Sequence, residues 1–226
     1  MFNSKQADYF PTSDGGDCNR RETIWIEKDV LVPIAGTNTA FLYLTSNWWS
    51  QIKTAGSAIY ANRHFLALYN TSHPERLTKE ENEKTPRIIG DVFIHETAVV
   101  DPTAVLGPNV SIGKNVRVGV GARIRESIVL GNSQIGDHSL VIYTVVGWNS
   151  SVGDWSRVEG TPDDPNPNKP FAKMENNPLF NSSGQLNPSI TILGSNVVVP
   201  SEVILLNSIV LPHKELGGSC KNQIIL

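Results

Sequence analysis

The chain has 226 residues, of which 39% are hydrophobic and 18% are charged, as in an ordinary soluble globular protein. The formal net charge of −3 gives no electrostatic reason to expect nucleic acid or an anionic membrane as a partner. No apolar run approaches the roughly 18 residues that cross a bilayer. Cys18 and Cys220 lie far apart without a metal-type spacing, which predicts free thiols in a reducing compartment, the cytoplasm by default.

The first 84 residues contain only short predicted elements. Residues 1–22 are polar and rich in turn formers, which predicts disorder and is unlike the apolar core of a signal peptide. Residues 40–44 are predicted to form a short strand. An amphipathic helix is predicted to end near Tyr69, with one face made of Ala58, Ala61, Phe65 and Leu68. A charged linker over 79–84 follows. These pieces are too few for an independent nucleotide-binding domain.

From Ile88 onward the sequence repeats with a period of six. A small or branched apolar residue lies two positions before each main repeat position. The main positions are Ile88, Ile94, Val100, Leu106, Ile112, Val118, Ile124 and Leu130, and the secondary ones are Val92, Ala98, Ala104, Val110, Val116, Ala122 and Ile128. A six-residue period fits neither a helix nor a hairpin, but it fits a coil with three short flat faces. We therefore predict a parallel β-helix, against an alternative series of antiparallel strands that lacks hairpin turn pairs.

The repeat also predicts how many coils the β-helix has. Glycines such as Gly107, Gly113 and Gly119 follow the aliphatic positions, where a tight corner leaves no room for a Cβ or requires a positive φ. The phase then slips to Ile135, Val141, Val146, Val152 and Val158, and it resumes at Leu193, Val199, Leu205 and Leu211. This spacing predicts roughly four coils before an interruption and one after it.

The interruption covers residues 159–189 and is predicted to be a loop inserted into a β-helix domain of residues 85–226. Its proline and asparagine content opposes both helix and sheet. A mobile loop and a partner-binding arm remain equally open. If it is an arm, apolar residues within it and two nearby tryptophans are candidate partner contacts, because tryptophan is enriched at interfaces. The candidate contacts are Trp148, Trp155, Asp164, Asn166, Met174 and Phe180. The tryptophans have the alternative of packing under the loop.

The sequence contains no convincing catalytic constellation. Gly119-Val120-Gly121 belongs to a β-helix corner and not to a phosphate-binding strand–loop–helix unit. His95 and His138 lie near corners, where acyltransferases built on hexapeptide β-helices often place a general base. Corner-filling histidines are commoner, so acyl transfer is the less favoured alternative. No two histidines are spaced as zinc ligands, and we predict no catalytic and no metal site.

Several motifs nevertheless resemble one enzyme family, mannose-1-phosphate guanylyltransferase (GDP-mannose pyrophosphorylase), and within it the regulatory alpha subunits. The resemblance runs from about Thr23 to the last residue. It is carried by Trp49–Lys53, Ala55–Tyr60, Val158–Pro162, Asp164–Asn168, Ile190–Gly194, Asn207–Leu216 and Asn222–Leu226. It implies a left-handed β-helix, with residues 23–84 as the remnant of a nucleotidyltransferase domain that is otherwise missing.

The resemblance also implies a role. Active family members have a Trp-x-Asp-Ile-Gly sequence whose aspartate helps to hold Mg²⁺, and here that position is Gln51 and the glycine is Lys53. A neutral amide is a poor ligand for this hard cation. The resemblance therefore implies a non-catalytic regulatory subunit that binds no cofactor itself, partnered by a catalytic beta subunit that uses Mg²⁺ and GTP. Self-association through the β-helix is also expected. An active nucleotidyltransferase, when full length, is the alternative.

Overall fold

The computed structural model describes residues 23–45, 47, 49, 52, 54–80, 85–162, 164 and 178–226. Two compact units are present, Met1–Asn47 and Trp48–Leu226. None of the described helices has the length and apolar character needed to cross a membrane.

In the first unit the described residues form only short helical turns. A π-helical segment, η2 (Ile26–Leu31), continues into α1 (Val32–Ile34). The predicted strand over 40–44 is wrong, because these residues have no regular structure. Phe41 and Leu44 are 92% and 84% exposed. A strand needs a neighbour to pair with, and the described part of this unit offers none.

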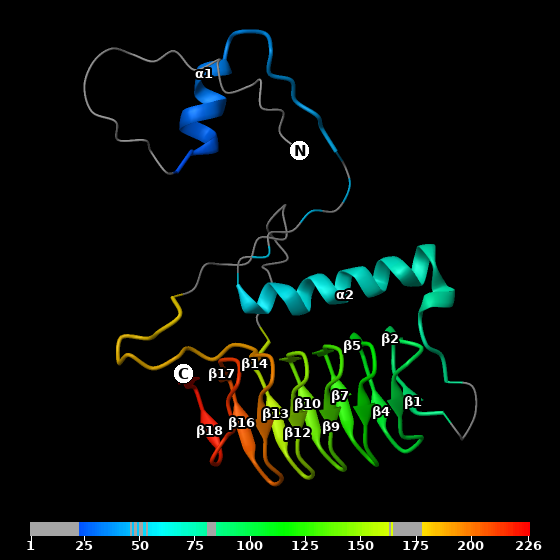
Figure 1. The fold of residues 1–226 in the computed structure, drawn as a ribbon. Helices are drawn as coiled ribbons and strands as arrows, with labels where there is room; N and C mark the ends of the chain where they lie inside the picture. The colour runs from blue at the N-terminus through cyan, green and yellow to red at the C-terminus, as the bar shows by residue number, and fades with distance from the viewer. Residues whose placement is uncertain are drawn as a thin grey trace. The chain divides into compact units, whose positions relative to one another are not determined.

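The second unit is a parallel β-helix, as predicted (Figure 1). The strands that the structure describes are β1 (Arg87–Ile88), β2 (Val92–Ile94), β3 (Val99–Val100), β4 (Val105–Leu106), β5 (Val110–Ile112), β6 (Arg117–Val118), β7 (Arg123–Arg125), β8 (Ile128–Val129), β9 (Gln134–Ile135), β10 (Leu140–Ile142), β11 (Thr144–Val146), β12 (Ser151–Val152), β13 (Arg157–Glu159), β14 (Thr191–Leu193), β15 (Val198–Val199), β16 (Ile204–Leu206), β17 (Ile209–Val210), β18 (Cys220–Lys221) and β19 (Ile224–Ile225).

These strands form three flat faces. Sheet 1 has the order β1-β4-β7-β10-β13-β16-β18, sheet 2 has β19-β17-β14-β11-β8-β5-β2, and sheet 3 has β15-β12-β9-β6-β3. Sheets 1 and 2 have seven strands each, which corresponds to about seven coils among the described residues. The sequence-based count of five coils was too low, because β18 and β19 form a further coil beyond the last recognised repeat position. The interruption also falls inside a coil, between β13 and β14, and that coil continues beyond it.

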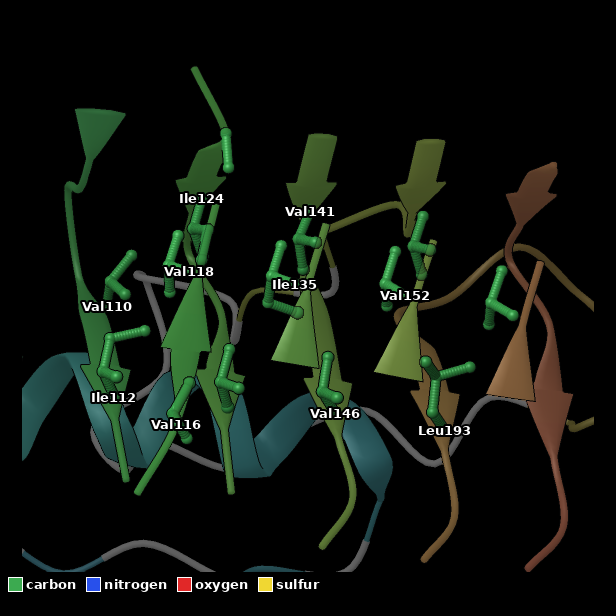
Figure 2. Close-up of a cluster of buried hydrophobic side chains, with 14 of the residues drawn as sticks. Val110, Ile112, Val116, Val118, Ile124, Ile135, Val141, Val146, Val152 and Leu193 are labelled. Atoms are coloured by element: carbon green, nitrogen blue, oxygen red, sulfur yellow. The ribbon is translucent and has the colours of Figure 1, made fainter. Parts of the chain in front are cut away.

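The core of the β-helix is a column of aliphatic side chains that point inward from all three sheets (Figure 2). Leu106, Ile112 and Ile124 are at most 1% exposed, and Val141 and Val158 are fully buried. These are positions that the six-residue period predicts, and each is stacked on its equivalent in the next coil. Aliphatic burial on this scale contributes about 1.5–3 kcal/mol for each large side chain.

At two predicted positions the phase is wrong by one residue. The inward residues are Val129 and Val210, both 1% exposed, and not Leu130 and Leu211. At the sheet 1 to sheet 2 edge the early coils take six residues between inward positions, whereas later coils take five. A coil with one shorter corner has 17 residues, so Val141 pairs with Ile124. The amide of Thr144 likewise donates a hydrogen bond to the hydroxyl of Ser127, 17 residues earlier. Ile128 accordingly points outward in sheet 2, and Ser127 occupies the buried position that was predicted for Ile128.

The corner glycines are required by the closeness of the next coil. A Cβ on Gly119 or Gly136 would collide with a carboxylate oxygen of Asp137 or Asp154, and one on Gly147 would collide with the Gly194 carbonyl. Of Gly107, Gly113 and Gly119, which follow the aliphatic positions, only Gly107 has a positive φ, and Gly121 at the end of its corner has one as well. The left-handed residues fall elsewhere in each corner and are often asparagine, which tolerates that conformation. Examples are Asn115, Asn132, Asn149 and Asn196.

The predicted helix is present as α2 (Ala55–Ser72), which runs across the coils (Figure 1) and is followed by a single 3₁₀ turn, η3 (Pro74–Arg76). Thr54 and Ser57 form a capping box at its start. The predicted contact face was wrong at Phe65 and Leu68, which are both 51% exposed, and right at Ala61, which is buried. The buried hydrophobic residues of α2 are Ile59, Ala61 and Leu66. The polar Asn62 lies on the same face and accepts a hydrogen bond of 2.5 Å from the Ser111 hydroxyl, a contact that an apolar pattern does not reveal.

Candidate partner-binding site

The insertion leaves the β-helix at the edge between sheets 1 and 2 and returns to the same edge. Its two ends are joined by a hydrogen bond of 3.0 Å from the Thr161 amide to the Ser189 carbonyl. The Thr161 hydroxyl also donates to the side-chain oxygen of Asn207 in the next coil, at 2.9 Å. The base of the insertion is therefore fixed to the coil stack.

The last part of the insertion, residues 178–187, forms a small hairpin. Phe180 and Leu186 make an antiparallel bridge. The side-chain oxygen of Asn181 accepts hydrogen bonds of 2.9 Å from the amides of Ser183 and Gln185. Leu186 is buried, whereas Phe180 is 46% exposed and lines an open groove with Ile224 of the last coil. The hairpin thus presents an aromatic side chain on a supported base.

The first part of the insertion is anchored by an ion pair that the sequence analysis did not foresee. Nη1 of Arg63, on α2, lies 2.9 Å from a carboxylate oxygen of Asp164. Nε of Arg63 also lies 3.1 Å from Glu126, whose side chain is 8% exposed. Asn109 donates a hydrogen bond of 3.0 Å to the other Glu126 oxygen.

This network has a clear electrostatic basis. Burial alone would lower the pKa of Arg63, but the carboxylates of Glu126 and Asp164 outweigh it and raise that pKa. Arg63 therefore stays charged and joins α2, a β-helix corner and the insertion. Asp164 was predicted as a partner contact, and the structure shows it in contact with its own chain, with 54% of its side chain still exposed.

The two tryptophans lie on the other two edges of the β-helix. Trp148 is on the corner between β11 of sheet 2 and β12 of sheet 3, and it is 56% exposed. Trp155 is on the corner between β12 and β13 of sheet 1, is 65% exposed, and stacks on His138 with 4.2 Å between ring centroids. Neither lies on the edge that carries the base of the insertion. The alternative that they pack under it stays a prediction, because residues 165–177 lie outside the described ones.

Three of the predicted positions cannot be placed in this arrangement. Asn166, Met174 and Gln51 lie outside the described residues. The partner contacts therefore stay a prediction for all six residues, and the metal position stays one as well. Of the six, the structure places only Asp164 and Phe180 on the insertion, with Trp148 and Trp155 exposed elsewhere.

The histidines considered for acyl transfer have structural roles. His95 Nδ1 accepts a hydrogen bond of 3.2 Å from the Thr97 amide and closes its own turn. His138 has a φ of 57° and packs against Trp155. In the described part of the chain no three histidine, cysteine or acidic residues are grouped so that they could hold a metal ion.

The comparison with solved structures is weak. PerB from Caulobacter crescentus, in complex with CoA and GDP-perosamine, aligns with a TM-score of 0.35 and 16% identity over 58% of this chain and 51% of that chain. A similarity at this level carries no argument about function.

The comparison with sequences is much stronger. The regulatory subunit alpha-B of mannose-1-phosphate guanylyltransferase from Danio rerio is 60% identical over 205 residues, 91% of this chain and 48% of that protein. The regulatory subunit alpha from Xenopus tropicalis is 60% identical over 207 residues, 92% of this chain and 49% of that protein. The chain thus spans about half the length of the curated relatives it matches. The family model of the GMPPB C-terminal domain matches residues 88–225, and the chain therefore belongs to that family.

Proposed function

We propose that the chain is a non-catalytic regulatory subunit of the mannose-1-phosphate guanylyltransferase complex, which forms GDP-mannose from GTP and mannose 1-phosphate. A catalytic beta subunit binds GTP and Mg²⁺, and this chain binds the beta subunit and restrains it. The names of the relatives support the regulatory role. Gln51, at the position of the family's metal-binding aspartate, supports the lack of catalysis because an amide compensates the charge of Mg²⁺ poorly.

The observation that carries the proposal is an insertion whose base is held at both ends. The Thr161–Ser189 hydrogen bond closes the base, and the Arg63–Asp164 ion pair fixes its first part to α2. A fixed base lowers the conformational entropy that is lost when the arm binds a partner. An arm built in this way is suited to reach a neighbouring subunit while the coil stack provides the assembly surface.

The experiment mixes the purified chain with a catalytic beta subunit and follows complex mass by light scattering and the rate of GDP-mannose formation. The wild-type chain is expected to form a stable complex with a lowered rate. A variant in which residues 165–177 are deleted should form the same complex and restore the rate. A second variant replaces this segment by a glycine–serine sequence of equal length. It distinguishes the effect of the arm's side chains on the rate from the effect of its length.

Two results would contradict the proposal at different levels. A deletion variant that inhibits as strongly as the wild-type chain would show that the arm does not restrain the enzyme. Absence of any complex with the wild-type chain would contradict its role as a subunit. Thermal unfolding of both variants, with the wild-type transition retained, controls for damage to the β-helix.

A further inference from the structure

The outward face of sheet 1 shows a regular alternation of arginine and aliphatic side chains. The strand register stacks the residues of one row directly on one another. In stacking order the row is Arg87, Val105, Arg123, Leu140, Arg157 and Ile204. Successive rungs are about 4.8 Å apart, so neighbouring arginines of the row are separated by about 10 Å. We call this row, together with Arg125 beside it, the arginine face.

The positive charge of the arginine face is largely uncompensated. Arg87, Arg123 and Arg125 are exposed, and none of them has an ion pair with a residue that the structure describes. Arg157 is paired with Glu159 of its own strand, with Nη2 and Oε2 2.5 Å apart. Glu159 is the single acidic side chain that the register places on this face, and its carboxylate is already paired with Arg157. Complementary charge must therefore come from another molecule.

The other two faces of the β-helix are different. The outward residues of sheet 2 include Ile128, Val145 and Ile192, and on this side α2 bonds to Ser111 while the hairpin lies against the last coil. Sheet 2 is thus occupied by the chain itself. The outward row of sheet 3 contains exposed Val99 and Val198 with polar residues between them, and it has one arginine, Arg117. Sheet 1 differs from it by combining aliphatic groups with several unpaired cations.

A second copy of the chain does not fit this face. In a symmetric pair with its two-fold axis parallel to the strands, each arginine rung meets an aliphatic rung of the other copy. With the axis along the stack, arginine meets arginine. Each copy brings one carboxylate, that of Glu159, which already pairs with Arg157. The guanidinium groups of Arg87, Arg123 and Arg125 outnumber it, and burying unpaired guanidinium groups is unfavourable.

We propose that the arginine face docks a different protein, whose surface presents carboxylates about 10 Å apart with apolar side chains between them. This inference rests on the proposed function only for the identity of the partner, which is then the catalytic beta subunit. Arg87, Arg123 and Arg125 supply charge-assisted hydrogen bonds to the carboxylates, and Leu140 and Ile204 supply the apolar contacts. Because sheet 1 and the insertion are different parts of the surface, docking and restraint are separable.

The first test reverses charge on one face at a time. Arg123→Glu, alone and with Arg87→Glu, should weaken the complex with the beta subunit by roughly tenfold or more, and raising the salt concentration should reduce the difference from wild type. Arg117→Glu is the matched control, because Arg117 is an equally exposed arginine at the start of a strand in sheet 3. It should leave the affinity unchanged. Thermal unfolding confirms that each variant retains the β-helix.

The second test identifies the chemistry of the partner. Arg123→Lys places a primary amine on the face, and a carbodiimide should join it by an amide bond to a carboxylate of the beta subunit with loss of water. Mass spectrometry then locates the cross-linked peptide. The matched variant Arg117→Lys should give no such peptide.

Each outcome bears on a different claim. A wild-type complex that the sheet 1 variants leave unchanged overturns the inference, while the proposed function stands. No complex with the wild-type chain overturns both. If the chain alone forms a dimer that Arg123→Glu abolishes, the occupant is a second copy and the inference is wrong. A complex that is weakened only by the sheet 1 variants, together with a cross-link from position 123 to a carboxylate of the beta subunit, supports the inference.

Discussion

The first coils and the later coils differ in the length and the buried residue of the same corner. At the sheet 1 to sheet 2 edge the first two coils take six residues and bury valine, Val92 and Val110, both fully. From Ile124 onward the corner is one residue shorter, except in the coil that carries the insertion, and the buried residue carries a hydroxyl. These residues are Ser127, Thr144, Thr191 and Ser208, each with no exposed area.

The hydrogen bonds differ between the two kinds of corner. In the longer corner the amide of Val110 donates to the backbone carbonyl of Asp91 at 3.3 Å. In the shorter corner the equivalent amide of Thr144 donates to the hydroxyl of Ser127 at 3.1 Å, and that hydroxyl donates to the Arg125 carbonyl at 2.7 Å. The acceptor of the buried amide thus changes from a backbone carbonyl to a side-chain hydroxyl. A buried amide must keep some partner, and the hydroxyl provides one here, as the hydroxyls of Ser133 and Ser156 do at corners that keep six residues.

The largest expected effect comes from the spacing between coils. At the sheet 2 to sheet 3 edge a Cβ on Gly147 would collide with the Gly194 carbonyl, whereas on Gly131 it would lie 3.1 Å from the Lys114 carbonyl. Gly147→Ala should therefore lower the free energy of unfolding by about 3 kcal/mol, and Gly131→Ala by about 1 kcal/mol or less. Chemical denaturation measures both. Gly217→Ala is the control, since nothing lies within 4 Å of its Cβ. Equal losses for the first two would show that the closer approach of the next coil at Gly147 does not determine the cost of a Cβ.

A smaller effect distinguishes the two corner chemistries directly. Ser127→Ala leaves the buried amide of Thr144 without an acceptor and should cost about 1–2 kcal/mol. Val110→Ala should cost a similar amount, about 2 kcal/mol, through lost apolar burial. Hydrogen exchange separates the causes: the Thr144 amide should lose protection beyond the global change in Ser127→Ala only. Selective loss at that amide in Val110→Ala as well would contradict the assignment.

The sequence predicted the coils well wherever the six-residue period is unbroken. It failed at Leu130 and Leu211, because Val129 and Val210 are equally apolar and an alternation of inward and outward side chains does not tell them apart. Serine two residues before the inward position does not mark the shorter corner by itself, because Ser133 and Ser150 occupy the same place in corners that keep six residues.

The candidate site was predictable only in part. The proline-rich interruption and the exposure of Trp148, Trp155 and Phe180 follow from local composition. The Arg63 network does not, because its partners lie 63 and 101 residues away and depend on where α2 packs. Periodicity identifies which residues form a helix, but a polar contact such as that of Asn62 decides which side of it faces the sheet.

The smallest expected effect concerns the corner between sheets 3 and 1. The hydrogen bonds that its aspartate accepts differ between the first coil and the later coils. In the first coil Asp101 accepts hydrogen bonds from the hydroxyl and amide of Thr103, at 2.6 and 2.9 Å. In later coils Asp137 and Asp154 accept instead from amides of the preceding coil, each at 2.8 Å. The Thr103 hydroxyl, and then its amide, lower the pKa of Asp101 below its ordinary value.

A lowered pKa in the folded state fixes the direction of the pH dependence. The contribution of Asp101 is complete above the pKa of the unfolded chain, and it is lost as the pH falls through the lower folded value. The amide resonance of Thr103 should therefore shift at a pH below the ordinary titration range of aspartate. Asp101→Asn should remove that shift and flatten the corresponding part of the stability profile, with only a small change at neutral pH. If the profile of Asp101→Asn keeps the same slope as that of the wild-type chain, the hydrogen bonds from Thr103 to Asp101 do not contribute to the acid sensitivity of the fold.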